Sequence, residues 1–139
     1  DWPALAQVVR AYPEFPILGS GDIFTPQSIF AMIDRTGVRA VSVARGCIGN
    51  PWIFRQAHEL MRGEQPSAPT LAHQRDVLAE HFELSVRLHG EDRAGRMMRK
   101  FGIKFARHHP RADEVANAFI AVKNLDDWRA VLARYYPTT

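Results

Sequence analysis

At 139 residues the chain is long enough for one domain, or for two small units that share a core. Its hydrophobic content of 46% and charged content of 24% are ordinary for a globular protein, and no apolar run approaches the roughly 18 residues that a transmembrane helix needs. The net charge of +3 excludes a chain that is strongly basic or strongly acidic throughout.

The N-terminus and the cysteine content favour a reducing compartment. DWPALAQVVR lacks the basic flank and the long apolar stretch of a signal peptide, and Cys47 has no second cysteine with which to pair. We therefore expect a cytoplasmic protein. Because the chain begins with Asp1 rather than Met, we also expect it to be a piece of a longer protein.

The first part of the chain begins with a helix and a strand. PALAQVVRAY has a helical spacing of apolar residues, and Pro3 is well placed for the first turn. FPILGSGD, at 15–22, is a short apolar run closed by glycines, which is typical of a buried strand.

A second helix and a second strand follow. In TPQSIFAMIDRTG, Thr25 can cap a helix, Pro26 fits its first position and Gly37 can end it. VRAVSVARG, at 38–46, is apolar and β-branched, which predicts another buried strand.

NPWIFRQAHELMRG repeats the helix-start signal, with Asn50 as the cap, Pro51 at the first position and Gly63 after the end. The two strands are joined by a helix, so they should be parallel. Two parallel strands do not make a stable sheet by themselves, and we expect the sheet to continue in chain that is absent here.

The pattern becomes helical after a polar, proline-containing linker, GEQPSAPT at 63–70. Four helices with short connections should form a small antiparallel bundle, with helices at 71–89, 92–108, 112–123 and 126–135. The fold class is therefore α/β over 1–62 and all-α over 71–139.

The two strand ends are the first candidate site. GSGD, at 19–22, follows the first strand, and Ala44, Arg45 and Gly46 follow the second. Ligands of parallel α/β folds gather at the carboxyl ends of strands, where glycines let backbone N–H groups approach a phosphate. Plain turns remain the alternative. Asp22 could contact a ligand or cap the next helix, and capping is the favoured use.

Two other kinds of site are not supported by the residues. Cys47 stands beside an arginine, but no histidine is near it in sequence, so we interpret it as a residue that fills space. His73, His81 and His89 are spaced by eight residues and would diverge around a helix, which argues against a metal site.

A basic stripe is the strongest signal in the helical part. From Arg93 to Arg111 the chain carries seven basic residues and no acid. Six of the seven step by three or four, so they share a narrow arc along about 27 Å of helix, with Arg99 outside it. A solvated face normally mixes signs, so the stripe favours contact with a nucleic-acid backbone by Arg93, Arg96, Lys100, Lys104, Arg107 and Arg111.

The other side of the same helix should face the core of the bundle. Its apolar residues occupy an adjacent arc and are Ala94, Met97, Met98, Phe101 and Phe105.

The stretch FPILGSGDIFTPQSIFAMIDRTGVRAVSVARGCIGNPWIF resembles the closing section of the barrel in the tRNA-dihydrouridine synthases, a family also labelled nitrogen-regulation proteins. RMMRKFGIKFARHHP is similar to a helix of that family's helical tail, and the resemblance covers essentially the whole chain. Ser20 stands where the family usually has Asn, Ala44 where it usually has Gly, and Phe101 where it usually has His.

The resemblance implies the last two strand-helix units of an FMN-containing (β/α)8 barrel, followed by a helical domain that helps to hold tRNA. In such enzymes NADPH reduces the flavin, which then reduces uridine to dihydrouridine. By position in the motifs, the flavin phosphate would be bound by Ser20, Gly21, Asp22, Ala44, Arg45 and Gly46. The catalytic cysteine and most flavin contacts would lie upstream, so no catalytic residue is expected here and the isolated fragment should be inactive.

Two alternatives stay open. One is another flavin barrel, such as a dihydroorotate-dehydrogenase-like enzyme, although a small-molecule enzyme does not need the basic stripe. The other is a non-catalytic RNA-binding or regulatory module that kept the helices and lost the barrel. A barrel fragment would also expose strand edges, so we expect self-association through residues 16–62.

Overall fold

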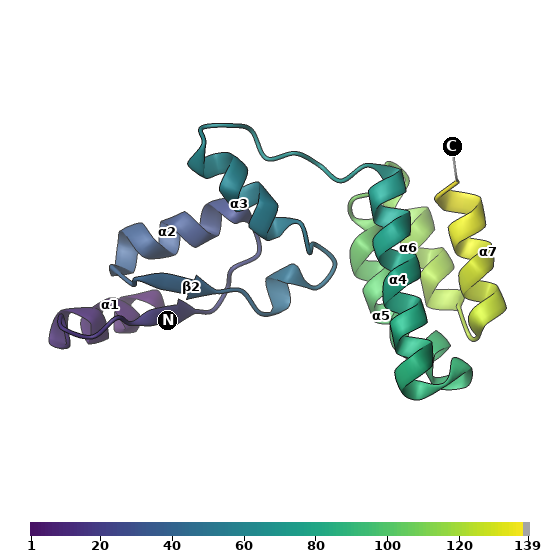
Figure 1. Ribbon diagram of the computed structural model, residues 1–139, viewed down its shortest axis with the longest axis horizontal. Helices are drawn as coiled ribbons and strands as arrows, with labels where there is room; N and C mark the ends of the chain where they lie inside the picture. The colour runs from purple at the N-terminus through teal and green to yellow at the C-terminus, as the bar shows by residue number, and fades with distance from the viewer. Residues whose placement is uncertain (138–139) are drawn as a thin grey trace. The chain divides into compact units, whose positions relative to one another are not determined.

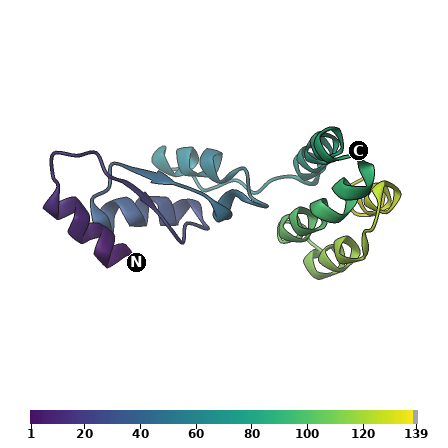
Figure 2. The same cartoon turned by 90° about the horizontal axis from the view of Figure 1, so that it is seen from below.

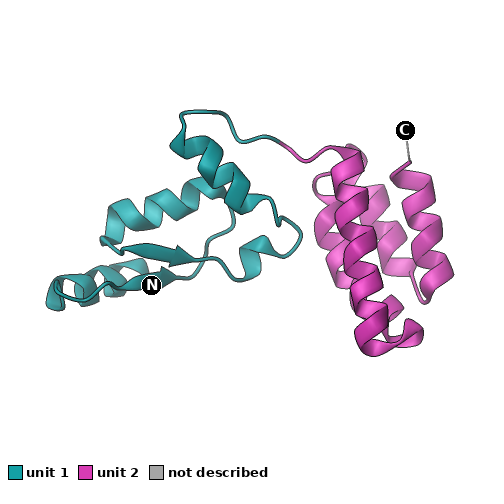
Figure 3. Ribbon diagram, viewed as in Figure 1, with its two compact units in different colours: residues 1–67 teal, residues 68–139 magenta. Residues whose placement is uncertain are grey.

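The computed structural model describes residues 1–137 and divides them into two compact units (Figures 1 and 3). The first unit covers Asp1–Ser67 and mixes helices with strands, and the second begins at Ala68 and is helical. The boundary falls inside the predicted 63–70 linker, in a stretch from Glu64 to Thr70 that has no helix or strand.

The first unit alternates helix and strand, as the sequence predicts. Its elements are α1 (Trp2–Ala11), β1 (Leu18–Ser20), α2 (Pro26–Thr36), β2 (Ala40–Ser42), the short 3-10 helix η1 (Arg45–Cys47) and α3 (Ile53–Met61). The strands are parallel, with Leu18 opposite Ala40 and Ser20 opposite Ser42, so the predicted parallel pairing is confirmed.

The start and end signals of α2 act as predicted. The Thr25 side chain accepts a hydrogen bond from the Ser28 N–H, and the Ser28 hydroxyl oxygen accepts one from the Thr25 N–H, which is a complete capping box. Gly37 ends the helix in the left-handed conformation, with φ of 75°.

The apolar faces of α1 and α2 lie against the strand pair, on the side that Figure 2 shows below the strands. Met32, Ile23 and Val38 are almost fully buried there. Partly buried side chains from both helices, from β2 and from residues next to the strands complete this core: Trp2, Leu5, Val9, Ile17, Ile29, Ile33, Val41 and Val43.

The start of α3 was predicted too early. Asn50 does not cap the helix; α3 begins at Ile53, with Trp52 as its N-cap residue. The Asn50 amide instead donates to Oε1 of Gln56 at 3.0 Å, a contact that local helix signals do not encode.

The second unit is built from α4 (Leu71–His89), α5 (Glu91–Ala106), α6 (Ala112–Ala121) and α7 (Leu125–Tyr135). The prediction of α4 is confirmed at both ends, whereas α5 and α6 each end two residues earlier than expected. α5 packs against each of the other three helices. The core is aromatic: the Trp128 ring lies 4.8 Å from the Phe82 ring and 4.9 Å from the Phe119 ring.

Within the described residues, no helix is long and apolar enough to cross a membrane.

Candidate functional site

The loops after β1 and β2 line one pocket of about 130 Å³. The parallel register ends both strands at the same level, with Ser20 opposite Ser42, so the loops that follow leave the pair side by side. The pocket therefore brings together six of the seven residues predicted at the strand ends, all but Gly19, with three more. The lining is Ser20, Gly21, Asp22, Ile23, Phe24, Ser42, Ala44, Arg45 and Gly46.

The first loop turns sharply through two consecutive residues with positive φ. Gly21 has φ of 117° and Asp22 has φ of 57°, and Asp22 is the one residue other than glycine with a positive φ in the described chain. The Trp2 indole N–H donates to the Gly21 carbonyl at 3.2 Å and ties the loop to the start of α1. Asp22 does not cap α2, because Thr25 does so; the favoured capping role was wrong.

Gly46 allows η1 to touch the first loop. A Cβ at Gly46 would lie 1.8 Å from the carbonyl oxygen of Ile23 and 3.1 Å from Cα of Phe24. No side chain fits at that distance, so the contact between the two loops depends on glycine at this position. The sequence marked Gly46 for the approach of a phosphate, and the structure gives it a packing role as well.

Arg45 is the cation of the pocket. Its side chain is 76% exposed, lies 4.0 Å from the Asp22 carboxylate and stands over the Phe24 ring. An ion pair this exposed contributes little to stability, so the guanidinium can turn toward an anion at small cost. Guanidinium, serine hydroxyls and glycine backbone form a donor set that suits a phosphate group.

Cys47 takes no part in the pocket lining. Its half-buried thiol donates to the Ala44 carbonyl at 2.9 Å, within η1. This contact agrees with the interpretation of Cys47 as a structural residue.

The second predicted site is the basic stripe, which lies on α5. Not all six of its residues are part of that helix. Five of the basic side chains are exposed on this helix or at its C-terminal cap, at Arg93, Arg96, Lys100, Lys104 and Arg107. Arg111 comes after the helix has ended; its guanidinium pairs with Glu114 and lies over the Tyr135 ring. The helical spacing from Arg107 to Arg111 was therefore wrong, because the chain turns at His108 and His109.

The predicted core face of α5 is only partly buried. Ala94, Met98 and Phe105 are buried, as expected, but Met97 and Phe101 keep part of their surface exposed. Gly95, Gly102 and Ala106 complete the buried face.

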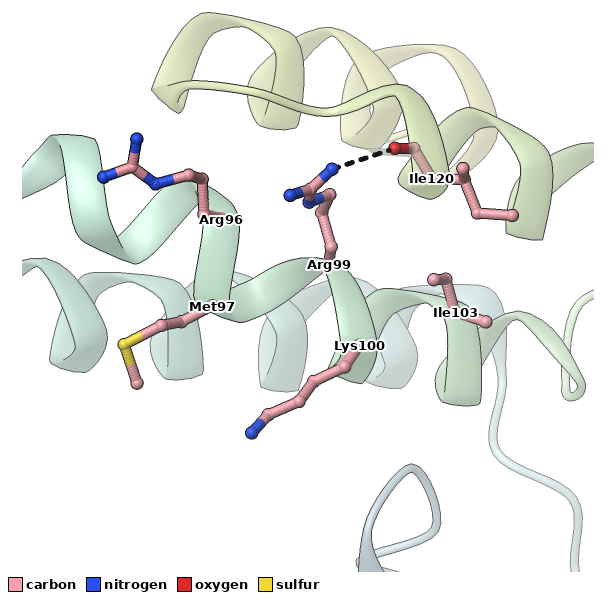
Figure 4. A pocket seen from close by; sticks show the side chains of 6 residues that line it. All are labelled: Arg96, Met97, Arg99, Lys100, Ile103 and Ile120. Atoms are coloured by element: carbon pink, nitrogen blue, oxygen red, sulfur yellow. Dashed lines mark hydrogen bonds between the residues drawn. The ribbon is translucent and has the colours of Figure 1, made fainter.

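A groove adjoins the basic side chains of α5, and the sequence did not indicate it. Arg96, Met97, Arg99, Lys100 and Ile103 line it from α5, and Ile120 lines it from α6 (Figure 4). The Nη1 group of Arg99 on α5 donates a hydrogen bond to the Ile120 carbonyl on α6, at 3.4 Å. The sequence analysis placed Arg99 outside the basic stripe. Because α6 packs beside it, Arg99 nevertheless lines the groove together with Arg96 and Lys100.

The histidines have separate surroundings. His81 packs edge-on against the Phe101 ring at 4.5 Å, and burial lowers the pKa of its imidazole. His109 is buried between the Tyr135 carbonyl and the Arg111 N–H. Among residues 1–137 no group of three or more His, Cys, Asp or Glu side chains is placed to hold a metal ion.

Comparison with known proteins identifies the family. The family model described as "Dihydrouridine synthase (Dus)" matches residues 1–135, which span both units and both candidate sites. The chain belongs to the dihydrouridine synthase family. Enzymes of this family depend on a flavin and have a (β/α)8-barrel catalytic domain, so a pocket at two parallel strand ends is in keeping with the family.

Relatives in this family match almost the whole chain. A "Probable tRNA-dihydrouridine synthase" of Mycobacterium leprae is 34% identical over 135 residues, which are 96% of this chain and 35% of the relative. A "tRNA-dihydrouridine synthase B" of Xanthomonas axonopodis pv. citri is 32% identical over 137 residues, which are 98% of this chain and 41% of the relative. The chain therefore spans between about a third and two fifths of the length of these dihydrouridine synthases.

Proposed function

We propose that this chain is the portion of a tRNA-dihydrouridine synthase that binds the flavin phosphate and contacts tRNA, in an enzyme that reduces uridine to dihydrouridine. The observation that carries the proposal is the single pocket formed by the loops after β1 and β2, within a chain that the family model matches almost end to end.

In this proposal residues 1–62 are the last two strand-helix units of the (β/α)8 barrel. The parallel register, the helix α2 between the strands and the pocket at the strand ends support this assignment. Residues 63–70 are the linker, and residues 71–139 are a helical tRNA-binding domain.

The cofactor in this proposal is FMN, with NADPH as the reductant. Bound FMN would supply hydride chemistry to the uridine. Arg45 would neutralise the phosphate, and Gly21 and Gly46 would let the backbone approach it, next to Ser20, Asp22 and Ala44. The proton donor and the contacts to the flavin ring would come from parts of the relatives that this chain does not span. The chain alone should therefore bind FMN weakly and reduce no RNA.

The tRNA surface in this proposal is the basic side of α5. Arg93, Arg96, Lys100, Lys104 and Arg107 extend over about 21 Å of helix, which is long enough to meet several phosphates. Arg99, with the half-exposed apolar side chains of the adjoining groove, would widen that surface. Arg111 is engaged by Glu114 and would contribute less.

The test is tRNA binding at a series of salt concentrations. Changing both Lys100→Glu and Lys104→Glu should weaken binding and flatten the dependence of affinity on salt, because two phosphate contacts are lost and fewer counterions are released. The matched control is Arg10→Glu with Arg39→Glu, which makes the same charge change at exposed positions of the first unit. An unchanged salt slope in the α5 variant, or an equal loss in the control, would refute a role of the stripe.

We also propose that the first unit mediates self-association when the chain is isolated. Within the described residues β1 and β2 pair only with each other, and Leu18, Phe15 and Tyr12 beside them are more than half exposed.

A further inference from the structure

The segment after α3 is held against that helix by a polar network. All three polar groups of Ser67 are engaged: its N–H and its hydroxyl each donate to the Glu59 carboxylate at 2.6 Å, and its carbonyl accepts from the Gln56 amide at 2.9 Å. The Glu64 N–H donates to the carbonyl of Glu59 at 2.9 Å. Residues 64–67, here called the strap, are thus bound at both ends.

Burial of Glu59 makes the docking of the strap energetically important. Glu59 is 8% exposed, and a buried carboxylate needs hydrogen-bond donors to replace water. Ser67 supplies two of them, and Arg55 adds a guanidinium at 3.4 Å. These contacts lower the pKa of Glu59, with the Ser67 hydroxyl as the largest cause. If the strap left the helix, the carboxylate would lose both short hydrogen bonds.

The same network reaches the loop of the phosphate pocket. The side-chain oxygen Oε1 of Gln56 accepts from the Asn50 side-chain amide at 3.0 Å, which fixes the orientation in which Nε2 of Gln56 can donate to the Ser67 carbonyl. Asn50 itself follows η1, and its N–H donates to the Cys47 carbonyl at 3.2 Å. The strap is therefore positioned relative to the turn that carries Arg45.

The chain is held again as soon as the second unit begins. The Gln74 side chain, 1% exposed, donates to the Pro69 carbonyl at 3.0 Å and to the His108 carbonyl at 3.2 Å. The Thr70 hydroxyl oxygen caps α4 by accepting from the His73 N–H. Ser67 is fixed by the first unit and Pro69 by the second, and exposed Ala68 lies between them.

We propose that Glu59 is a positioning residue: it docks the strap on α3, so that the connection between the flavin-phosphate unit and the helical unit pivots at Ala68 and is not a free linker of eight residues. Releasing the strap lengthens the free connection to at least residues 64–68 and widens the range of positions that the helical unit can take. The importance of this restriction for catalysis rests on the proposed function, but the docking itself does not.

The first experiment measures hydrogen exchange of the Ser67 amide in the whole chain. Glu59→Gln should speed this exchange by about tenfold or more, because a neutral amide is a weaker acceptor than the carboxylate. Ser67→Ala, which changes an exposed side chain and leaves the fold intact, should speed it by less, since the N–H bond to Glu59 stays. Glu64→Gln is the matched control: it makes the same charge change on the strap, loses only the exposed pair with Arg62, and should leave the rate unchanged.

The second experiment measures the freedom of the two units. Spin labels at Arg10→Cys and Ala130→Cys, in a Cys47→Ser background, report the spread of distances between the units. Glu59→Gln should broaden this distribution, and Glu64→Gln should not. Slow exchange of α2 amides in each variant shows that the fold of the first unit is retained. A Ser67 amide that exchanges as fast as a free peptide, or equal distributions in the two variants, would overturn the proposal, whether or not the chain binds tRNA.

Discussion

Gly46 is the residue on which the geometry of the pocket most directly depends. The carbonyl oxygen of Ile23 occupies the space where a Cβ would stand, at 1.8 Å. The backbone of Ile23 cannot move aside as easily as the end of a flexible side chain can. Any larger residue must therefore push η1 away from the first loop, and Arg45 moves with η1.

We predict that Gly46→Ala lowers the free energy of unfolding of the first unit by about 1–3 kcal/mol, which is the usual cost of overpacking. Urea denaturation followed by the fluorescence of Trp2 and Trp52 measures it. Cys47→Ala, in the same turn, should cost less than Gly46→Ala, because it removes only a thiol from a half-buried position. Equal losses in the two variants would show that the contact with Ile23 is not tight.

Residue types pointed to the pocket, but they did not describe its interior. Glycines and an arginine after two apolar runs pointed to the two strand ends, and the family resemblance implied that Ser20, Gly21, Asp22, Ala44, Arg45 and Gly46 gather there, as they do in the pocket. The left-handed conformation of Asp22 and its approach to Arg45 depend on tertiary packing of the two loops, which leaves no local pattern in the sequence.

At the scale of elements, α5 combines a basic surface with a buried face of small residues. A Cβ at Gly102 would lie 2.4 Å from the Phe119 ring, and one at Gly95 would lie 2.9 Å from the backbone of Asn124. These glycines let α6 and the turn before α7 approach the helix closely. The same approach places Ile120 beside Arg99 and forms the groove.

We expect Gly102→Ala to destabilise the second unit by about 1–3 kcal/mol, despite the gain of up to about 1 kcal/mol in helix propensity. The Phe119 ring cannot simply move away, because it packs on Trp128 at 4.9 Å. Thermal unfolding followed by circular dichroism tests this. Phe119→Leu should recover part of the loss when combined with Gly102→Ala, and a double mutant that is strictly additive would contradict the clash.

Helix positions were predictable from sequence, while several helix ends were not. Thr25, Gly37 and Thr70 act on neighbouring backbone groups, so their effect is visible locally. Asn50 carries an equally good cap signal, yet its side chain bonds Gln56 because that amide also holds Ser67. A cap signal can be overridden by a tertiary partner that lies outside the window in which it is read.

On the scale of the whole molecule, the first unit carries exposed apolar side chains at its strand pair, whereas the basic side chains of α5 belong to the second unit. Leu18 is 66% exposed on β1, at the edge of a sheet with two strands in the described residues, whereas the basic side chains lie on α5. Strand edges with apolar neighbours associate readily in water.

We predict that the isolated chain sediments as a concentration-dependent oligomer, and that Leu18→Lys shifts it toward the monomer. Leu88→Lys is the matched control, because Leu88 is 75% exposed but lies on α4, in the other unit. A wild-type chain that stays monomeric at high concentration, or a Leu88→Lys variant that dissociates equally, would refute association through the strands.

The hydrogen bond from the Trp2 indole to the Gly21 carbonyl provides the molecule with an optical probe of its own. Gly21 lines the pocket, so an anion that rearranges this loop also changes the polarity around the indole and its emission. Trp128 is 1% exposed in the core of the second unit, where it serves as an internal reference. With Trp52 replaced by Phe, occupancy of the pocket can be followed by fluorescence without attaching any label.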